Sequence, residues 1–178
     1  YKLKNLAMNV KKLLLIVCSV FLVVSLSKAQ DYDYIGAAKC KMCHNKAAKG
    51  TQYDIWKAGP HAGAFATLAS EESKKYSDDP QNDPKCLKCH STYHSASADL
   101  MLTIKAEEGV SCESCHGPGS SYKSMAIMKD KAKSLAAGMI EPTEAVCKTC
   151  HNEESPTYKP FNYAEKVAKI AHPNPLAQ

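Results

Sequence analysis

Apolar residues are unevenly distributed along this chain. The longest apolar run covers residues 13–26, and from residue 30 onward large aliphatic residues are sparse. Short stretches of helix-forming residues there alternate with turns rich in Gly, Pro and polar residues, a pattern typical of short helices joined by loops. Residues 100–105 have the composition of a short strand. We therefore expect a mostly α fold with little or no sheet.

Gly and Pro mark the ends of the expected helices. Helix-forming stretches bounded by such residues cover 45–58, 62–68, 120–137 and 162–171. A further short helix should start at Pro142 and Thr143. Irregular structure is expected at residues 77–85 and 152–160.

The N-terminal apolar run has the features of a secretory signal peptide. Lys11 and Lys12 precede it, and small residues follow at positions 27 and 29, which a signal peptidase would read. The run is short for a membrane span, although an uncleaved anchor is the alternative. We expect residues 1–29 to comprise upstream residues and a signal peptide, residues 30–178 to form one domain, and the protein to be periplasmic or extracellular.

The charge of the chain is concentrated in this leader. The whole sequence has 23 basic and 18 acidic residues, a formal charge of +5. Five of the lysines lie within residues 1–29, and the remainder carries equal numbers of both signs. The basic balance is therefore a property of the leader and predicts no nucleic-acid partner.

The sequence Cys-x-x-Cys-His occurs four times and uses eight of the nine cysteines. It is the attachment motif of c-type haem. Its two thiols face the same side of a helical turn and can add to the two vinyl groups of one haem, and the following histidine ligates the iron. The predicted attachment residues are Cys40, Cys43, Cys86, Cys89, Cys112, Cys115, Cys147 and Cys150, and the proximal ligands are His44, His90, His116 and His151. We expect four haem c groups, each with its iron.

Other uses of cysteine fit this pattern poorly. A zinc site needs a second cysteine pair or a spaced histidine pair, but it does not need His directly after every pair. A thioredoxin-like centre needs one Cys-x-x-Cys beside a βαβ pattern, which is not visible. A disulfide framework would not place eight cysteines as four identical pairs.

Three histidines remain as candidates for the second axial position of four irons. They are His61, His94 and His172. His61 and His172 each flank a proline at a helix end, where a ring can be directed at a cofactor. His94 follows His90 too closely to reach over the same haem. Methionine is the other haem ligand available, and Met125 is the candidate; its ordinary role would be packing within a helix.

The chain resembles the tetrahaem cytochrome c-554 family, known from ammonia-oxidising bacteria. The resemblance covers most of residues 36–172. It rests on the first motif followed by Trp56 and His61-Ala62-Gly63-Ala64-Phe65, and on the string Cys-Glu-Ser-Cys-His-Gly-Pro-Gly at 112–119. It implies a mostly α electron carrier with closely stacked haem pairs.

The resemblance also implies a ligand set. His61 would pair with His151 and His172 with His116, while the second haem, on His90, would have no second ligand. The family has a histidine soon after the Cys-His-Gly-Pro-Gly string, which serves the first haem, and this chain has none there. The sixth ligand of the His44 haem is therefore Met125, His94 or none.

These features favour an electron-transfer protein that works with redox partner proteins. Association with a membrane redox complex and oligomer formation are both compatible with the sequence. One alternative is an enzyme that acts on a small nitrogen oxide at an open haem. Another is a subunit of a cytochrome filament, in which a histidine of one subunit ligates a haem of the next.

Overall fold

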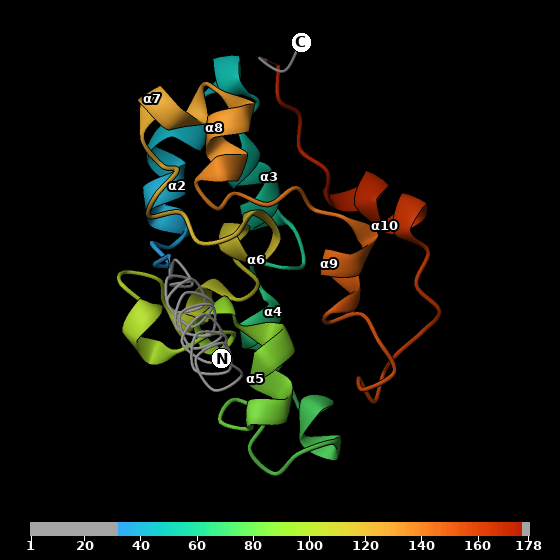
Figure 1. The fold of residues 1–178 in the computed structure, drawn as a ribbon. Coiled ribbons are helices and arrows are strands. Elements are labelled where there is room, and N and C mark those ends of the chain that lie inside the picture. The colour runs from blue at the N-terminus through green and yellow to red at the C-terminus, as the bar shows by residue number, and fades with distance from the viewer. Residues whose placement is uncertain (1–31, 176–178) are drawn as a thin grey trace, which may run out of the picture. The chain divides into compact units, whose positions relative to one another are not determined.

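The computed structural model describes residues 32–175, and the predicted leader at residues 1–29 lies outside this range. Short helices connected by loops make up the described chain (Figure 1). The α-helices are α2 (Ala37–His44), α3 (Gln52–Ala58), α4 (Ala64–Thr67), α5 (Pro84–His90), α6 (Cys112–His116), α7 (Met125–Met128), α8 (Lys131–Ala136), α9 (Glu144–Lys148) and α10 (Tyr163–Ile170). Single turns of 3-10 helix occur at Ala47–Lys49, Ser73–Lys75, Thr92–His94, Ala98–Leu100 and Ala106–Glu108.

The prediction of a mostly α fold is confirmed. In place of a strand at residues 100–105, the described chain has one isolated bridge, between Tyr34 and Met101. No helix within residues 32–175 is long and apolar enough to cross a membrane.

Several helix ends follow the signals in the sequence. Asp83 caps α5 by accepting a 2.8 Å hydrogen bond from the backbone N–H of Lys85, with Pro84 as the first helical residue. Gly117 ends α6 with a φ of 76°, a left-handed conformation that suits glycine. The predicted helices after Thr143 and within 162–171 are present as α9 and α10.

Two predicted helices are each broken in the structure. The stretch 45–58 was expected to be one helix, but a 3-10 turn, Gly50 at φ 99° and Thr51 at φ 48° separate α2 from α3. The stretch 120–137 is divided into α7 and α8, because Asp130 leaves the helical conformation and accepts a 3.1 Å hydrogen bond from the N–H of Lys133. Such a cap begins a new helix and interrupts the earlier one.

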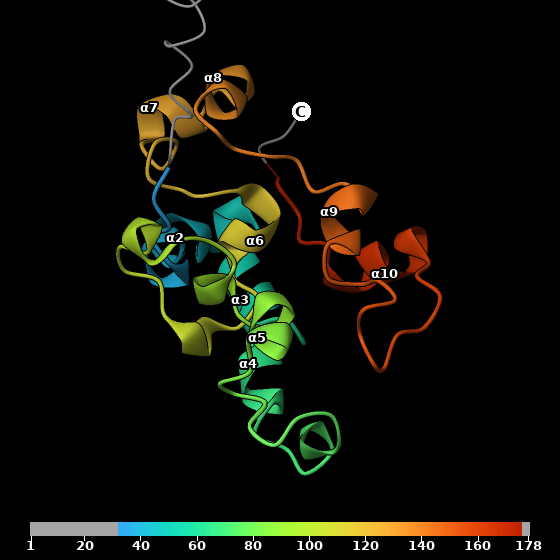
Figure 2. The ribbon, with the colours of Figure 1, turned by 60° about the horizontal axis from the view of Figure 1, so that its bottom comes forward.

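The packing of the helices brings distant motifs together. Helix α2 packs against α3 and α6, α4 packs against α5, and α7 packs against α8. Figures 1 and 2 both show α9 beside α10. The hydroxyl of Tyr163, the first residue of α10, donates a 3.3 Å hydrogen bond to the carbonyl of Pro142, which precedes α9.

Few apolar side chains of residues 32–175 are buried against other protein atoms. They are Ile35, Ala37, Ala62, Leu68, Leu87, Ile104 and Tyr122. Buried Ser, Thr, Gln and Glu side chains accompany them. A core of this size contributes little hydrophobic stabilisation for a chain of this length, so the described fold needs apolar surface from another source.

Candidate haem-binding site

Each motif lies on its own short helix, as two thiols separated by one helical turn require. Motifs one to three end α2, α5 and α6, and motif four begins in α9. Although α9 ends at Lys148, the N–H of His151 still donates to the Cys147 carbonyl at 2.9 Å, so the turn continues through the motif. All eight motif thiols are unpaired and half-buried. They are therefore available for thioether bonds.

The motifs are arranged in two neighbouring pairs. The thiols of Cys40 and Cys112 lie close enough for each to shift the pKa of the other, which brings motifs one and three together. This contact and burial raise the pKa of Cys40. Cys89 likewise contacts Cys150, joining motifs two and four, and burial together with Cys150 raises the pKa of Cys89 to about 11.

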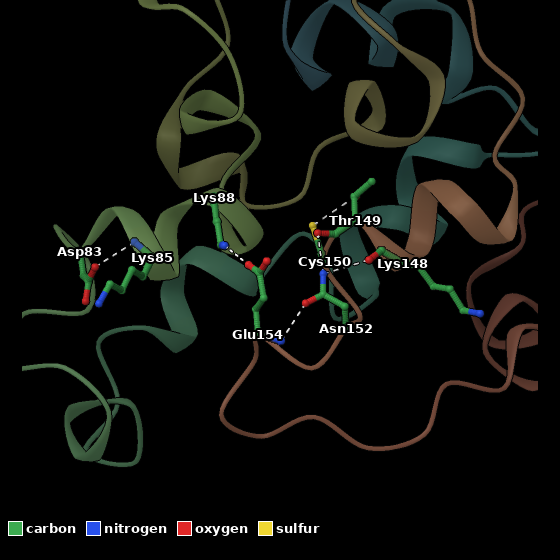
Figure 3. Close-up of polar contacts among 8 residues, drawn as sticks. All are labelled: Asp83, Lys85, Lys88, Lys148, Thr149, Cys150, Asn152 and Glu154. Atoms are coloured by element: carbon green, nitrogen blue, oxygen red, sulfur yellow. Dashed lines mark hydrogen bonds and ion pairs between the residues drawn. The ribbon is translucent and has the colours of Figure 1, made fainter.

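A surface ion pair and a closed turn accompany the second of these pairs (Figure 3). Lys88, inside motif two, is paired with Glu154, which follows motif four. Asn152 closes the intervening turn: its side chain donates to the carbonyls of Lys148 and Thr149 at 3.0 Å and accepts from the N–H of Glu154 at 2.9 Å. Because Lys88 and Glu154 are exposed, their attraction adds little stability, and the backbone turn does more to fix the segment.

Two pairs of imidazoles face each other across gaps of similar width. The ring centres of His61 and His151 are 6.1 Å apart, and those of His116 and His172 are 5.9 Å apart. An iron–nitrogen bond of about 2 Å places the ring centre about 3 Å from the metal, so two imidazoles on opposite sides of one iron are about 6 Å apart. Both pairs therefore fit one haem iron between them.

The protonation of these histidines also suits metal binding. Burial lowers the pKa of His61, and the neighbouring His151 lowers it further. Burial lowers the pKa of His116, with His172 adding to the effect, and burial is the main cause of the lowered pKa of His151. A lowered pKa keeps imidazole neutral near pH 7, and the neutral ring is the form that ligates a metal.

Backbone contacts hold His61 in position. The N–H of Val110 donates to the His61 carbonyl at 2.9 Å, and the indole N–H of Trp56 donates to the Val110 carbonyl at 2.9 Å. Phe161 stacks on the opposite member of the pair, His151, at 5.0 Å. Phe161 was not singled out in the sequence, because nothing in residues 152–160 indicates that the chain turns back onto motif four.

The imidazole of His90 is oriented by α4. Its Nδ1 lies 2.8 Å from the Ala64 carbonyl, with the Thr67 hydroxyl at 3.4 Å. Donation from Nδ1 to a carbonyl leaves Nε2 free to bind iron, the usual arrangement for a metal-binding histidine. The sequence could not indicate the Ala64 carbonyl, since any residue can supply this acceptor.

The other two predicted ligands lie at the surface. His94 is exposed, and its ring meets Tyr93 edge-on at 5.0 Å. Met125 begins α7 with 58% of its surface exposed. The roles of His94 and Met125 as ligands stay predictions. The sixth ligand of the predicted His44 haem is still Met125, His94 or none, and the predicted His90 haem would have none.

Glu113, between the two cysteines of motif three, is buried and fastens the start of α2 to this motif. Its carboxylate accepts hydrogen bonds from the N–H groups of Ile35 at 2.9 Å, Gly36 at 2.8 Å and Gly119 at 2.7 Å. Burial raises the pKa of Glu113 and outweighs the opposing effect of these hydrogen bonds. This residue was only part of a motif string in the sequence, and its role depends on contacts 77 and 78 residues away.

Helical motifs, free thiol pairs and facing imidazoles define a c-type cytochrome. Comparison with known proteins agrees. Residues 39–117 match the family model described as cytochrome c554 and c-prime. The chain is also 32% identical over 112 residues to cytochrome c-554 of Nitrosomonas europaea, a match that covers 54% of this chain and 43% of that protein. No solved structure matches.

These matches confirm the predicted resemblance to the cytochrome c-554 family and support the attachment of c-type haem. The matched family segment contains the first three motifs, Trp56 and His61. Since the match spans less than half of the Nitrosomonas protein, the particular role of that protein does not transfer with the family.

Proposed function

We propose that this chain carries four haem c groups, one on each motif, and passes electrons between redox partner proteins outside the cytoplasm. The spacing of the two imidazole pairs carries the proposal. The ring centres of these pairs, 5.9 and 6.1 Å apart, match the separation of two imidazole ligands on opposite sides of one iron.

Each part of the site has a role in this proposal. The eight motif cysteines hold the haems covalently, and His44, His90, His116 and His151 are the proximal ligands. His61 completes the coordination on His151, and His172 completes it on His116. The bound haems supply one-electron exchange between ferric and ferrous iron. The protein side chains adjust the redox potentials through ligation, burial and hydrogen bonding.

The contacts between motifs suggest the route of the electron. Cys40 meets Cys112, and Cys89 meets Cys150. Cys115 lies close enough to Cys147 for its pKa to be raised by it, after the larger effect of burial, to about 11. The route therefore joins motif one to three, three to four, and four to two.

Residues 1–29 have a separate role in the proposal: they direct export and are removed. Haem c is then attached outside the cytoplasm, and partner proteins reach the haems there. Docking to a membrane redox complex and self-assembly are compatible with this location.

The experiment has two parts. Intact mass spectrometry of the exported protein should show four covalent haems and an N-terminus near Gln30. His61→Ala and His172→Ala should each convert one of the four ferric haems from low spin to high spin in electron paramagnetic resonance, because each removes one axial ligand. Tyr76→Ala, at an exposed ring outside the motifs and the two histidine pairs, is the control for the substitution itself.

Each result bears on a different part of the proposal. Fewer than four haems would contradict the haem count, and a retained leader would contradict cleavage. Two variants that both remain fully low spin would rule out the assigned ligand pairs.

A further inference from the structure

Thr92 lies two residues after His90, directly beyond motif two, and only 1% of its surface is exposed. Its hydroxyl donates to the Gly109 carbonyl at 3.2 Å and accepts from the Ser111 N–H at 2.7 Å. The Ser114 hydroxyl, 2.6 Å away, is the third partner. A hydroxyl group has one donor and two acceptor sites, so Thr92 uses all three. The chain that leaves motif two is therefore fixed on the segment that leads into motif three.

One peptide group links Thr92 to His61. The Gly109 carbonyl also accepts from the backbone N–H of Thr92, at 2.8 Å. The N–H of the same peptide, on Val110, donates to the His61 carbonyl at 2.9 Å. A peptide group is planar and rigid, so its carbonyl and its N–H move together. The backbone of His61, the proposed distal ligand of the motif-four haem, therefore follows the position of Thr92.

Further hydrogen bonds lead from His61 back to His90. The Ala64 N–H donates to the His61 carbonyl at 3.1 Å, and the Ala64 carbonyl accepts from His90 Nδ1 at 2.8 Å. Gly109 also lies against Ala64, since a Cβ on Gly109 would be 3.1 Å from the Ala64 nitrogen. Hydrogen bonds thus form a closed circuit from the His90 ring through Ala64, His61 and the Gly109–Val110 peptide to Thr92.

We propose that Thr92 is a positioning residue for two haems. Its hydroxyl holds the Gly109–Val110 peptide, which fixes both the backbone of His61 and the acceptor of the His90 ring. A fixed acceptor on the second ring nitrogen orients a metal-binding histidine. Motifs two and four are neighbours, as the ion pair between Lys88 and Glu154 shows. One hydroxyl group therefore governs a ligand of each haem in this pair.

The inference rests on the proposed four-haem function and is tested in the full haem-loaded protein. Thr92→Val keeps the shape of the side chain and removes the hydroxyl, whereas Thr92→Ser keeps the hydroxyl. In Thr92→Val the His90 Nδ1 proton should exchange with solvent about five- to tenfold faster, because loss of one ordinary hydrogen bond changes a local opening equilibrium by about this factor. Thr92→Ser should restore the wild-type exchange rate.

The haem of motif four gives the second readout. Thr92→Val should raise its potential, because a displaced His61 stabilises ferric iron less. In a His61→Ala background the same substitution should leave this potential unchanged, since the residue through which it acts is gone. Thr157→Val is the matched control, because Thr157 is exposed and its hydroxyl contacts Ser155 at 3.3 Å, outside the circuit.

Nuclear magnetic resonance of the reduced protein measures the exchange of the ring proton, and a redox titration measures the potential. An unchanged exchange rate in Thr92→Val, or a potential shift that persists in His61→Ala, would overturn the inference. If Thr92→Val does not fold, Thr92→Ala removes the hydroxyl without placing a methyl group against Ser111 and must give the same two changes. If His61→Ala instead left every haem low spin, the proposed ligand pair would be wrong, and the exchange of the His90 proton would still decide the role of Thr92.

Discussion

Single backbone atoms decide where His61, the proposed distal ligand of the fourth motif, lies. Gly109 has a φ of +66°, and a Cβ there would be 2.6 Å from the His61 carbonyl oxygen and 3.1 Å from the Ala62 carbonyl oxygen. Both obstacles are backbone atoms, so a side chain cannot turn aside to relieve them. The next residue, Val110, donates a hydrogen bond to the His61 carbonyl and accepts one from the indole N–H of Trp56.

Replacing Gly109 with Ala should therefore displace His61. We expect a cost of about 1–3 kcal/mol in the free energy of unfolding from the left-handed conformation and the close contacts, and a partial conversion of one ferric haem to high spin. Guanidinium denaturation and electron paramagnetic resonance measure the two effects. Gly63→Ala is the control, since its Cβ would meet only the Pro60 carbonyl oxygen, at 3.8 Å. A low-spin, stable Gly109→Ala protein would contradict this role.

The sequence indicates ligands better than it indicates the residues that hold them. A five-residue string predicts the cysteines and the proximal histidines, and the family resemblance adds predicted partners for His116 and His151. Glu113 and the Ala64 carbonyl are different. Their roles come from contacts made only after folding, and neither a common side chain nor a backbone oxygen has a local signature.

At the scale of the elements, a local stop signal predicted the end of α6, while two helix breaks were not predicted. Gly117 ends α6 as expected, because glycine readily takes the left-handed conformation. The break before α3 has a distant cause, since Gly50 and Thr51 bend where the loop meets the C-terminal segment. The break at Asp130 has a local cause and was a readable signal, because Asp is a preferred helix cap.

The contact between the start of α2 and α6 depends on the hydrogen bonds of the Glu113 carboxylate. Replacing this carboxylate should weaken the contact. In Glu113→Gln one carboxylate oxygen becomes an NH2 group that faces backbone N–H donors from Ile35, Gly36 or Gly119. The expected loss in the free energy of unfolding is about 1–3 kcal/mol. Denaturant titration measures it, with Glu107→Gln, at an exposed neighbouring position, as the control.

The same carboxyl predicts a dependence on pH. Its folded-state pKa is raised above 4.5, so between the ordinary and the raised pKa the unfolded chain has lost a proton that the folded chain keeps. The stability contributed by this group is present below the ordinary pKa and is lost as the pH rises through the raised value. The advantage of the wild type over Glu113→Gln should therefore narrow as the pH rises through this window. If this difference in stability widened instead, the hydrogen bonds to Glu113 would lower its pKa by more than burial raises it.

At the scale of the whole described chain, the small apolar core and the four motifs have one explanation. The buried apolar side chains are few and small, and Ser91, Thr92, Ser111 and Ser134 are among the most completely buried residues. The four proposed haems would bring the apolar surface that these side chains do not. Sequence composition already suggested this, because large aliphatic residues are sparse after residue 30. The spacing of the motifs along the sequence does not predict which motifs lie together, since the conformation of the loops between them sets that arrangement.

The number of histidines limits how many of the proposed haem irons can have two histidine ligands. Seven histidines, four of them proximal, leave three for four irons, so at least one haem of a monomer is not bis-histidine. With His61 and His172 paired, the haems on His44 and His90 are the candidates. An open iron should give a high-spin ferric signal and bind carbon monoxide when reduced. A methionine ligand should give a weak near-red charge-transfer band and a raised potential.

Met125→Ala separates these two outcomes. It should abolish the charge-transfer band and create an open iron only if Met125 is the ligand. Met42→Ala, at an exposed methionine inside motif one, is the control. Turnover of a small nitrogen oxide at an open iron would favour the enzyme over the carrier. Four bis-histidine haems cannot form in a monomer of this sequence. If an assembled sample showed them, a histidine such as the exposed His94 would have to cross from one subunit to the next, which is the arrangement that a cytochrome filament requires.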